Sequence, residues 1–147
     1  MLRACLLSEV GVQVASFEEI EHTADRAFRV RGRDMADLLE NAARAMQALD
    51  ERSSAREPSA TEEIEVEGVD RESLLVNWLN EILYLEQARQ LVCEEFHIAE
   101  LDNHRLRAQI ETRKCDRSQT HIKAVTFHNL HIREVSGGLE AEVVLDV

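Results

Sequence analysis

The apolar residues of this sequence change their spacing along the chain, and this change most constrains the fold. Residues 34–50 and 70–90 repeat apolar side chains at three- and four-residue intervals, which predicts two amphipathic helices. Asp34 and Asp70 precede these repeats, where an aspartate can cap the first helical turn. Two such helices need an apolar surface on which to pack.

Alternating apolar and polar residues occupy most of the remaining chain and predict β-strands. Asp102-Asn103 and Gly137-Gly138 separate neighbouring alternating segments and indicate tight hairpins, hence largely antiparallel pairing. We therefore expect an α+β fold with two amphipathic helices packed on one face of a mostly antiparallel or mixed sheet. The expected strands are residues 17–30 (with an interruption), 62–68, 91–101, 104–113, 120–135 (one strand or two) and 139–147.

The length of 147 residues is typical of a single domain, which we place at residues 17–147. A domain of this size needs no metal or disulfide to form a core. Residues 1–16 hold a short apolar stretch that Glu9 interrupts, without a clear cleavage site. We expect them to be a poorly ordered extension or an added first strand. Residues 51–61 are polar, contain the one proline and predict a loop.

The net charge of −12, from 29 acidic and 17 basic residues, bears on the choice of partner. Nucleic-acid affinity comes largely from lysine and arginine on phosphates, so direct RNA or DNA binding is disfavoured as a primary role. The charge suits docking onto a basic protein or binding of a cation. Three widely spaced cysteines (Cys5, Cys93 and Cys115) predict reduced thiols and a cytoplasmic location. No apolar run approaches the ~20 residues of a membrane span.

Polar residues gather where the first predicted strand is interrupted, in the tetrad His-Thr-Ala-Asp at residues 22–25. A second polar feature lies at the other end, where Asp146 stands beside the carboxylate of Val147. Two anionic groups repel each other unless a cation or a hydrogen-bond donor lies between them, and a hard cation prefers such oxygen ligands. A frayed, solvated tail is the alternative interpretation.

Lys123 stands within an apolar stretch, either on the solvent face of a strand or near clustered carboxylates whose repulsion it offsets. His128 and His131 are three residues apart, and on a strand they would point to opposite sides, which disfavours a paired-histidine metal site. Common phosphate-binding, nucleophile-elbow and HExxH zinc motifs are absent from the sequence.

Three segments together resemble the archease family: "FEEIEHTADRAFRVRG", "IKAVTFHNL" and the final "EVVLDV". The segment "GVDRESLLVNWLNE", which enters the second helix, is similar too, and the resemblance extends from about Phe17 to Val147. The chain departs from the family pattern at three positions. Ala27, Phe127 and Asn129 stand where the family often has glycine, tyrosine and aspartate.

The resemblance implies an accessory protein of the GTP-dependent, RtcB-type RNA-splicing ligase rather than an enzyme. Archeases promote guanylylation and repeated turnover of that ligase in tRNA splicing or RNA repair, so RNA would be contacted only indirectly. The metal-binding positions of the family correspond to Asp25, Asp146 and Val147. Ca²⁺ is the first expectation, with Mg²⁺ or Mn²⁺ as alternatives. The important lysine of the family corresponds to Lys123, and His22 takes a supporting role.

Two other functions stay open on the sequence alone. A chaperone-like module that protects RNA-modifying proteins from aggregation would use an apolar or acidic surface and not the metal site. A metal-dependent hydrolase could also use carboxylates and a cation to activate water. The hydrolase is disfavoured because the sequence offers no convincing nucleophile or general base beyond His22 and His128.

Overall fold

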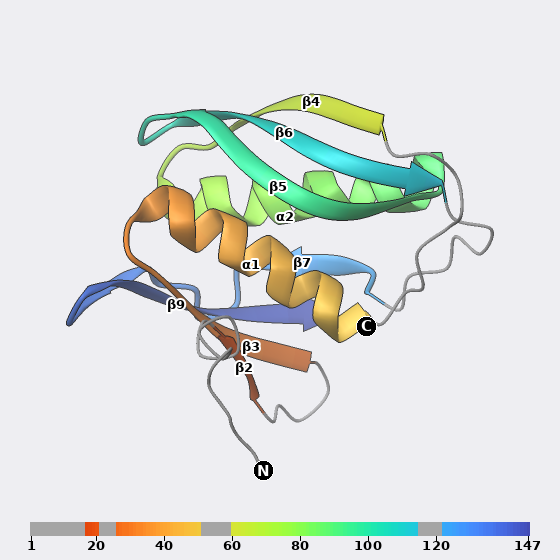
Figure 1. The fold of residues 1–147 in the computed structure, drawn as a ribbon. Helices are drawn as coiled ribbons and strands as arrows, with labels where there is room; N and C mark the ends of the chain where they lie inside the picture. Colours follow the sequence, from red (N-terminus) through yellow and green to blue (C-terminus); the bar gives the residue numbers. More distant parts are fainter. Residues whose placement is uncertain (1–16, 21–25, 51–59, 115–121) are drawn as a thin grey trace, which may run out of the picture.

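The computed structural model describes residues 17–20, 26–50, 60–114 and 122–147. In this part of the chain two helices, α1 (Met35–Asp50) and α2 (Arg71–Arg89), lie between two β-sheets (Figure 1). Neither helix is long and apolar enough to cross a membrane. The strands are β2 (Phe17–Ile20), β3 (Arg26–Gly32), β4 (Ala60–Glu67), β5 (Leu91–Leu101), β6 (Arg105–Lys114), β7 (Ala124–Thr126), β8 (Arg133–Val135) and β9 (Gly138–Asp146).

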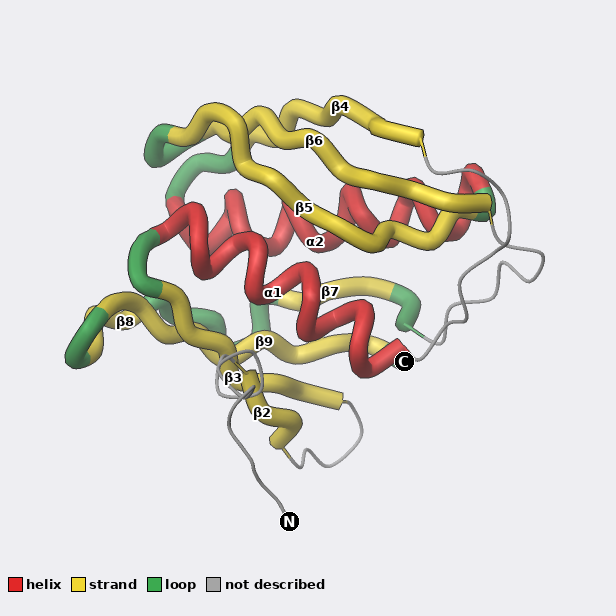
Figure 2. Tube along the Cα trace, in the orientation of Figure 1, coloured by secondary structure: helices red, strands yellow, loops and turns green. Residues whose placement is uncertain are grey.

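The lower sheet in Figure 2 has the strand order β2-β3-β9-β7, and β8 also pairs with β9. The upper sheet has the order β4-β6-β5. All the pairs found between these strands are antiparallel. The central strand of the lower sheet is therefore β9, and the first part of the described chain pairs with its last part.

The predicted α+β class with antiparallel strands is confirmed, but its detail of a single sheet is not. The helices contact strands of both sheets and so form a middle layer. The reason lies in α2. Its predicted apolar stripe comprises Leu74, Leu75, Trp78, Leu79, Ile82 and Leu83. Val76 and Leu85 lie off this stripe and are nevertheless only 2% and 4% exposed. A helix that is apolar on most sides is buried on most sides, and a second sheet supplies the extra cover.

Aspartates cap both helices, as predicted. The N–H of Asp37 donates to Oδ1 of Asp34 at 2.9 Å, and the N–H of Ser73 donates to Oδ1 of Asp70 at 2.7 Å. Each bond satisfies an N–H group that has no partner within its own helix. The two helix starts are therefore set by local sequence.

A glycine precedes each cap by two residues, and the two strand-to-helix junctions are built alike. A Cβ atom at Gly32 would lie 2.3 Å from the main-chain nitrogen of Leu38. A Cβ atom at Gly68 would lie 2.5 Å from the main-chain nitrogen of Leu74. Each glycine thus lets its strand end directly against the first turn of the next helix. This repeated junction was not predicted from the sequence.

The predicted hairpins are confirmed, with turns between β5 and β6 and between β8 and β9. The stretch 120–135 forms two short strands, β7 and β8, so the second of the two alternatives holds. The predicted loop 51–61 ends earlier, because β4 begins at Ala60 and pairs with β6 along its length. Residues 1–16 and 51–59 lie outside the described residues.

Candidate functional site

Lys123 and Asp146 lie side by side where β7 begins and β9 ends. Ala124 pairs with Asp146, and the main-chain N–H of Lys123 donates to the main-chain oxygen of Asp146 at 2.7 Å. The side chain of Lys123 and those of Asp146 and Val147 are exposed. The fold thus brings together three of the five residues that the sequence analysis selected.

Amide side chains of α2 hold the segment that carries Lys123. Oδ1 of Asn80 accepts from the N–H of Val125 at 2.9 Å, and its Nδ2 donates to the oxygen of the same residue at 3.2 Å. Nε2 of Gln87 donates to the main-chain oxygen of Ile122 at 3.1 Å. Lys123 therefore lies between two residues that α2 anchors.

The start of β3 lies beside the end of β9. Arg26 pairs with Leu145, which is the first step of a register that continues to Gly32 and Leu139. A metal site shared by Asp25 and Asp146 requires the start of the domain to lie near its end, and the described residues meet this requirement. Asp25 and His22 lie outside the described residues, so their place in the site stays a prediction.

The charges of this site are not neutralised by the described part of the chain. Neither the Lys123 ammonium nor the Asp146 carboxylate forms an ion pair with a described residue. The guanidinium of Arg26 bonds to Glu19 at 2.8 Å and to the main-chain oxygen of Leu49 at 2.8 Å. Lys123 and Asp146 are thus available to an outside group.

The donor atoms of this site meet only part of the requirements of a metal ion. The described residues contain no group of three or more histidine, cysteine, aspartate or glutamate side chains that could hold one. Asp146 and Val147 offer only oxygen atoms, which suit a hard cation such as Ca²⁺ better than a soft one. The described residues therefore supply only part of an oxygen site, and a further ligand would have to come from outside them.

The segment between β7 and β8 differs from the prediction. His128 lies in a turn rather than on a strand, and its Nε2 is 3.3 Å from Nδ2 of Asn129. Asn129 has a φ of 52°, a left-handed conformation that asparagine adopts more readily than most residues. Phe127, just before the turn, is 56% exposed. Strand alternation therefore does not decide where these side chains point.

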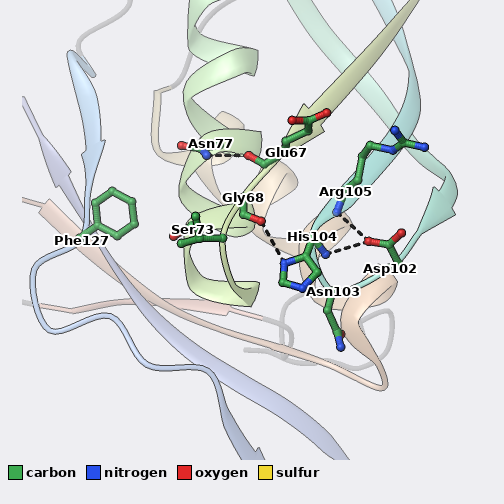
Figure 3. A pocket seen from close by; sticks show the side chains of 10 residues that line it. Glu67, Gly68, Ser73, Asn77, Asp102, Asn103, His104, Arg105 and Phe127 are labelled. Carbon is green, nitrogen blue, oxygen red and sulfur yellow. Dashed lines mark hydrogen bonds between the residues drawn. The ribbon is translucent and has the colours of Figure 1, made fainter.

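A second candidate site, which the sequence analysis missed, is a hollow of about 770 Å³ beside the start of α2 (Figure 3). Nδ2 of Asn77 donates to the main-chain oxygen of Glu67 at 2.8 Å. A hydrogen bond from the His104 N–H holds the pKa of Asp102 below its usual value. Lining residues come from three segments that are distant in the sequence, 67–77, 102–105 and 127: Glu67, Gly68, Val69, Ser73, Asn77, Asp102, Asn103, His104, Arg105 and Phe127.

Together these features define a small α+β protein whose N- and C-terminal strands meet beside exposed charged side chains. The chain belongs to the archease family, because the model of the archease protein family (MTH1598/TM1083) matches residues 17–147. The resemblance seen in the sequence is thereby confirmed.

Relatives and solved structures agree with this assignment. The chain is 39% identical to protein archease of Methanopyrus kandleri over 138 residues, which cover 89% of this chain and 99% of that protein. The solution structure of Methanobacterium thermoautotrophicum protein 1598 matches with a TM-score of 0.63 and 30% identity, over 90% of this chain and 99% of that one. A crystal structure from Thermotoga maritima, described as an archease and possible chaperone, matches with a TM-score of 0.65 over 88% and 96%. Its identity of 24% supports the fold alone.

Proposed function

We propose that this protein is a non-enzymatic activator of an RtcB-type RNA ligase. It promotes GTP-dependent guanylylation of the ligase, and hence repeated turnover, in tRNA splicing or RNA repair in the cytoplasm. One observation carries the proposal: Lys123 and Asp146 are joined through their main chains, while their charged groups are exposed and unpaired within the described residues. The ligase as partner is what the resemblance to the archease family implies, and membership of that family supports it.

The proposed metal site combines Asp25 with Asp146 and Val147. Arg26, which follows Asp25 in the sequence, pairs with Leu145, which precedes Asp146. This register supports the expectation that the two carboxylates can share a cation, with His22 orienting Asp25. A bound divalent ion, Ca²⁺ first and Mg²⁺ or Mn²⁺ as alternatives, would supply a fixed positive charge at this tip of the molecule.

Lys123 would act beside the metal. Its ammonium can contact the phosphates of the nucleotide in the ligase or offset the repulsion between the carboxylates. The net charge of −12 favours approach to a basic, RNA-handling surface of the ligase, because complementary charges steer encounter. RNA itself would meet this protein only through the ligase.

The test is a guanylylation assay of the RtcB-type ligase of the same organism, with and without this protein. We expect Asp25→Ala and Asp146→Ala to abolish stimulation while the ligase keeps its unstimulated rate. Glu142→Ala is the matched control, because Glu142 is an exposed acid on the same strand as Asp146 whose contact is with Arg29. If both aspartate variants stimulate as well as the Glu142→Ala protein, the proposal fails.

A chaperone-like module is the second candidate. The Thermotoga maritima archease is described as a possible chaperone, and this chain exposes large apolar side chains at Val69, Tyr84 and Phe127. Exposed apolar surface of this kind can bind unfolded clients. The test combines Asp25→Ala, Asp146→Ala and Lys123→Ala in one variant. This function would be favoured over activation if the variant still suppresses client aggregation and if the wild-type protein leaves the ligase rate unchanged.

A further inference from the structure

The strand β4 forms one edge of the upper sheet, whose order is β4-β6-β5. Its register fixes the direction of its main-chain groups. The N–H of Gly68 donates to the oxygen of His104, directly opposite, at 2.8 Å. Residues of an antiparallel strand bond alternately to one side and to the other. The main-chain groups of the even-numbered residues of β4 therefore bond to β6. The N–H and C=O groups of the odd-numbered residues face outward: Thr61, Glu63, Glu65 and Glu67.

At some other strand edges, side chains of the helices bond to individual main-chain groups. Oε2 of Glu40 accepts from the N–H of Ile98 in β5 at 2.9 Å. Oε2 of Glu72 accepts from the N–H of Ile132, just before β8, at 3.0 Å. Asn80 bonds to both main-chain groups of Val125 in β7. Such cover removes the unpaired groups on which another strand could pair.

The edge of β4 is open along most of its length among the residues that the structure describes. The one outward group with a partner is the oxygen of Glu67, which accepts from Asn77 at the end of the strand. No described group bonds to the outward N–H or C=O of Thr61, Glu63 or Glu65. An open strand of this length can accept an added strand through main-chain hydrogen bonds.

Apolar side chains are exposed beside this open edge. The bond from Asn77 to Glu67 brings one side of α2 next to β4, and Figure 1 shows α2 between β4 and β7. Tyr84 follows Asn77 by two helical turns on the same side and is 58% exposed. Val69 and Phe127, at 80% and 56% exposure, line the hollow beside the Glu67 end of β4. An added strand would find apolar surface on its helix-facing side.

The charges of β4 decide which kind of partner strand fits its open edge. The exposed side chains of Glu63, Glu65 and Glu67 form no ion pair with a described residue. A second copy of β4 would set glutamates opposite glutamates, which is unfavourable in paired strands. Nucleic acid carries the same sign of charge. A strand with lysine or arginine at alternate positions would instead meet the glutamates with opposite charge.

We propose that the open edge of β4 binds an extended segment of a partner protein in which basic and apolar residues alternate. The main chain of the segment pairs with Thr61, Glu63 and Glu65. Its basic side chains lie beside the glutamates on the outer face of the sheet, and its apolar side chains pack towards Tyr84. This surface is separate from the proposed metal site, and the inference does not depend on ligase activation.

The probe is an eight-residue, end-blocked peptide of alternating lysine and valine, matched to the eight residues of β4. Affinity for the full chain is measured by calorimetry, and binding is located by amide hydrogen exchange. We expect exchange at Glu63 and Glu65 to slow on binding. A peptide of the same composition with all lysines at one end should bind at least about tenfold more weakly, because it cannot satisfy both faces of a paired strand.

Two variants separate main-chain pairing from charge. Glu65→Pro removes an outward N–H and no bond to β6, and Glu63→Lys reverses one charge; each should weaken binding by about tenfold. Glu95→Lys is the matched control, because Glu95 is an exposed glutamate of the same sheet, on the opposite edge strand β5. Its effect should stay within about twofold.

Three results would overturn the proposal. One is equal weakening by Glu63→Lys and Glu95→Lys, which would indicate general attraction between opposite charges. The second is unaltered exchange at Glu63 and Glu65 in the wild-type protein with saturating peptide, a readout that needs no variant to fold. The third is a dimer in sedimentation equilibrium that Glu65→Pro dissolves, which would make a second copy the occupant.

Discussion

The main-chain N–H of Lys123 donates to the main-chain oxygen of Asp146 at 2.7 Å, while both side chains remain exposed. The bond extends the pairing of β7 with β9 by one step, beyond Ala124. The main chain of Lys123 thus contributes to the sheet, and its ammonium contributes nothing to the described ion pairs. The structural and functional roles of this residue can therefore be separated by mutation.

Lys123→Ala should lower ligase stimulation and leave the free energy of unfolding within about 0.5 kcal/mol of wild type, as is usual for an exposed side chain. Lys123→Pro removes the N–H as well, and should destabilise the protein by about 1 kcal/mol or more. Urea denaturation and the guanylylation assay measure the two effects. Full stimulation by Lys123→Ala would show that the ammonium has no part in activation.

Asn80→Ala should destabilise the protein by about 2 kcal/mol, because it leaves the N–H and C=O of partly covered Val125 without their partner. Amide exchange at Val125 should become faster, and ligase stimulation should fall with it. Asn77→Ala is the control, since Asn77 makes one bond, to Glu67, and none to β7. Unchanged exchange at Val125 in Asn80→Ala would contradict the anchoring role.

Gly32→Ala should destabilise the protein by about 2 kcal/mol or more, because the new Cβ would lie 2.3 Å from the nitrogen of Leu38 and would push α1 away from β3. Gly137→Ala should cost less, about 1 kcal/mol, because its φ of 87° disfavours alanine although the space is open. Urea denaturation of both variants shows which one loses more of the free energy of unfolding. A larger loss for Gly137→Ala than for Gly32→Ala would show that α1 can shift without a loss of stability.

The surroundings of Glu140 predict that the protein loses stability in acid. Its side chain is buried, and a hydrogen bond from Arg31, aided by Arg133, holds the pKa of Glu140 below its usual value. A carboxyl whose pKa is lower in the folded state stabilises the protein above its unfolded pKa, and this stability is lost as pH falls through the folded pKa. The unfolding free energy of wild type should therefore fall as the pH drops below the unfolded pKa of about 4.5.

Glu140→Gln should be less stable than wild type at neutral pH and should lose less stability on acidification. Glu134→Gln is the control, because Glu134 is exposed and forms no ion pair within the described residues. Urea denaturation across this pH range provides the comparison. Identical pH profiles for wild type and Glu140→Gln would show that the two arginines do not act on stability through this carboxyl.

The sequence by itself determined which helices and long strands form and where the helices begin, since these depend on neighbours in the chain. Helical spacing identified α1 and α2, and Asp34 and Asp70 cap them as predicted. Alternation identified the long strands, and turn residues placed the hairpins. The sequence also identified Lys123 and Asp146 as candidate site residues, through the segments that resemble the archease family.

Only the tertiary structure decided how these elements combine. Alternation states that one side of a strand is apolar but not which element covers it, so the division into two sheets around the helices was not predictable. The same holds for the bond between Lys123 and Asp146 and for the open edge of β4, which depend on strand order. Strand order is decided by long-range packing, for which a single sequence carries no local signal.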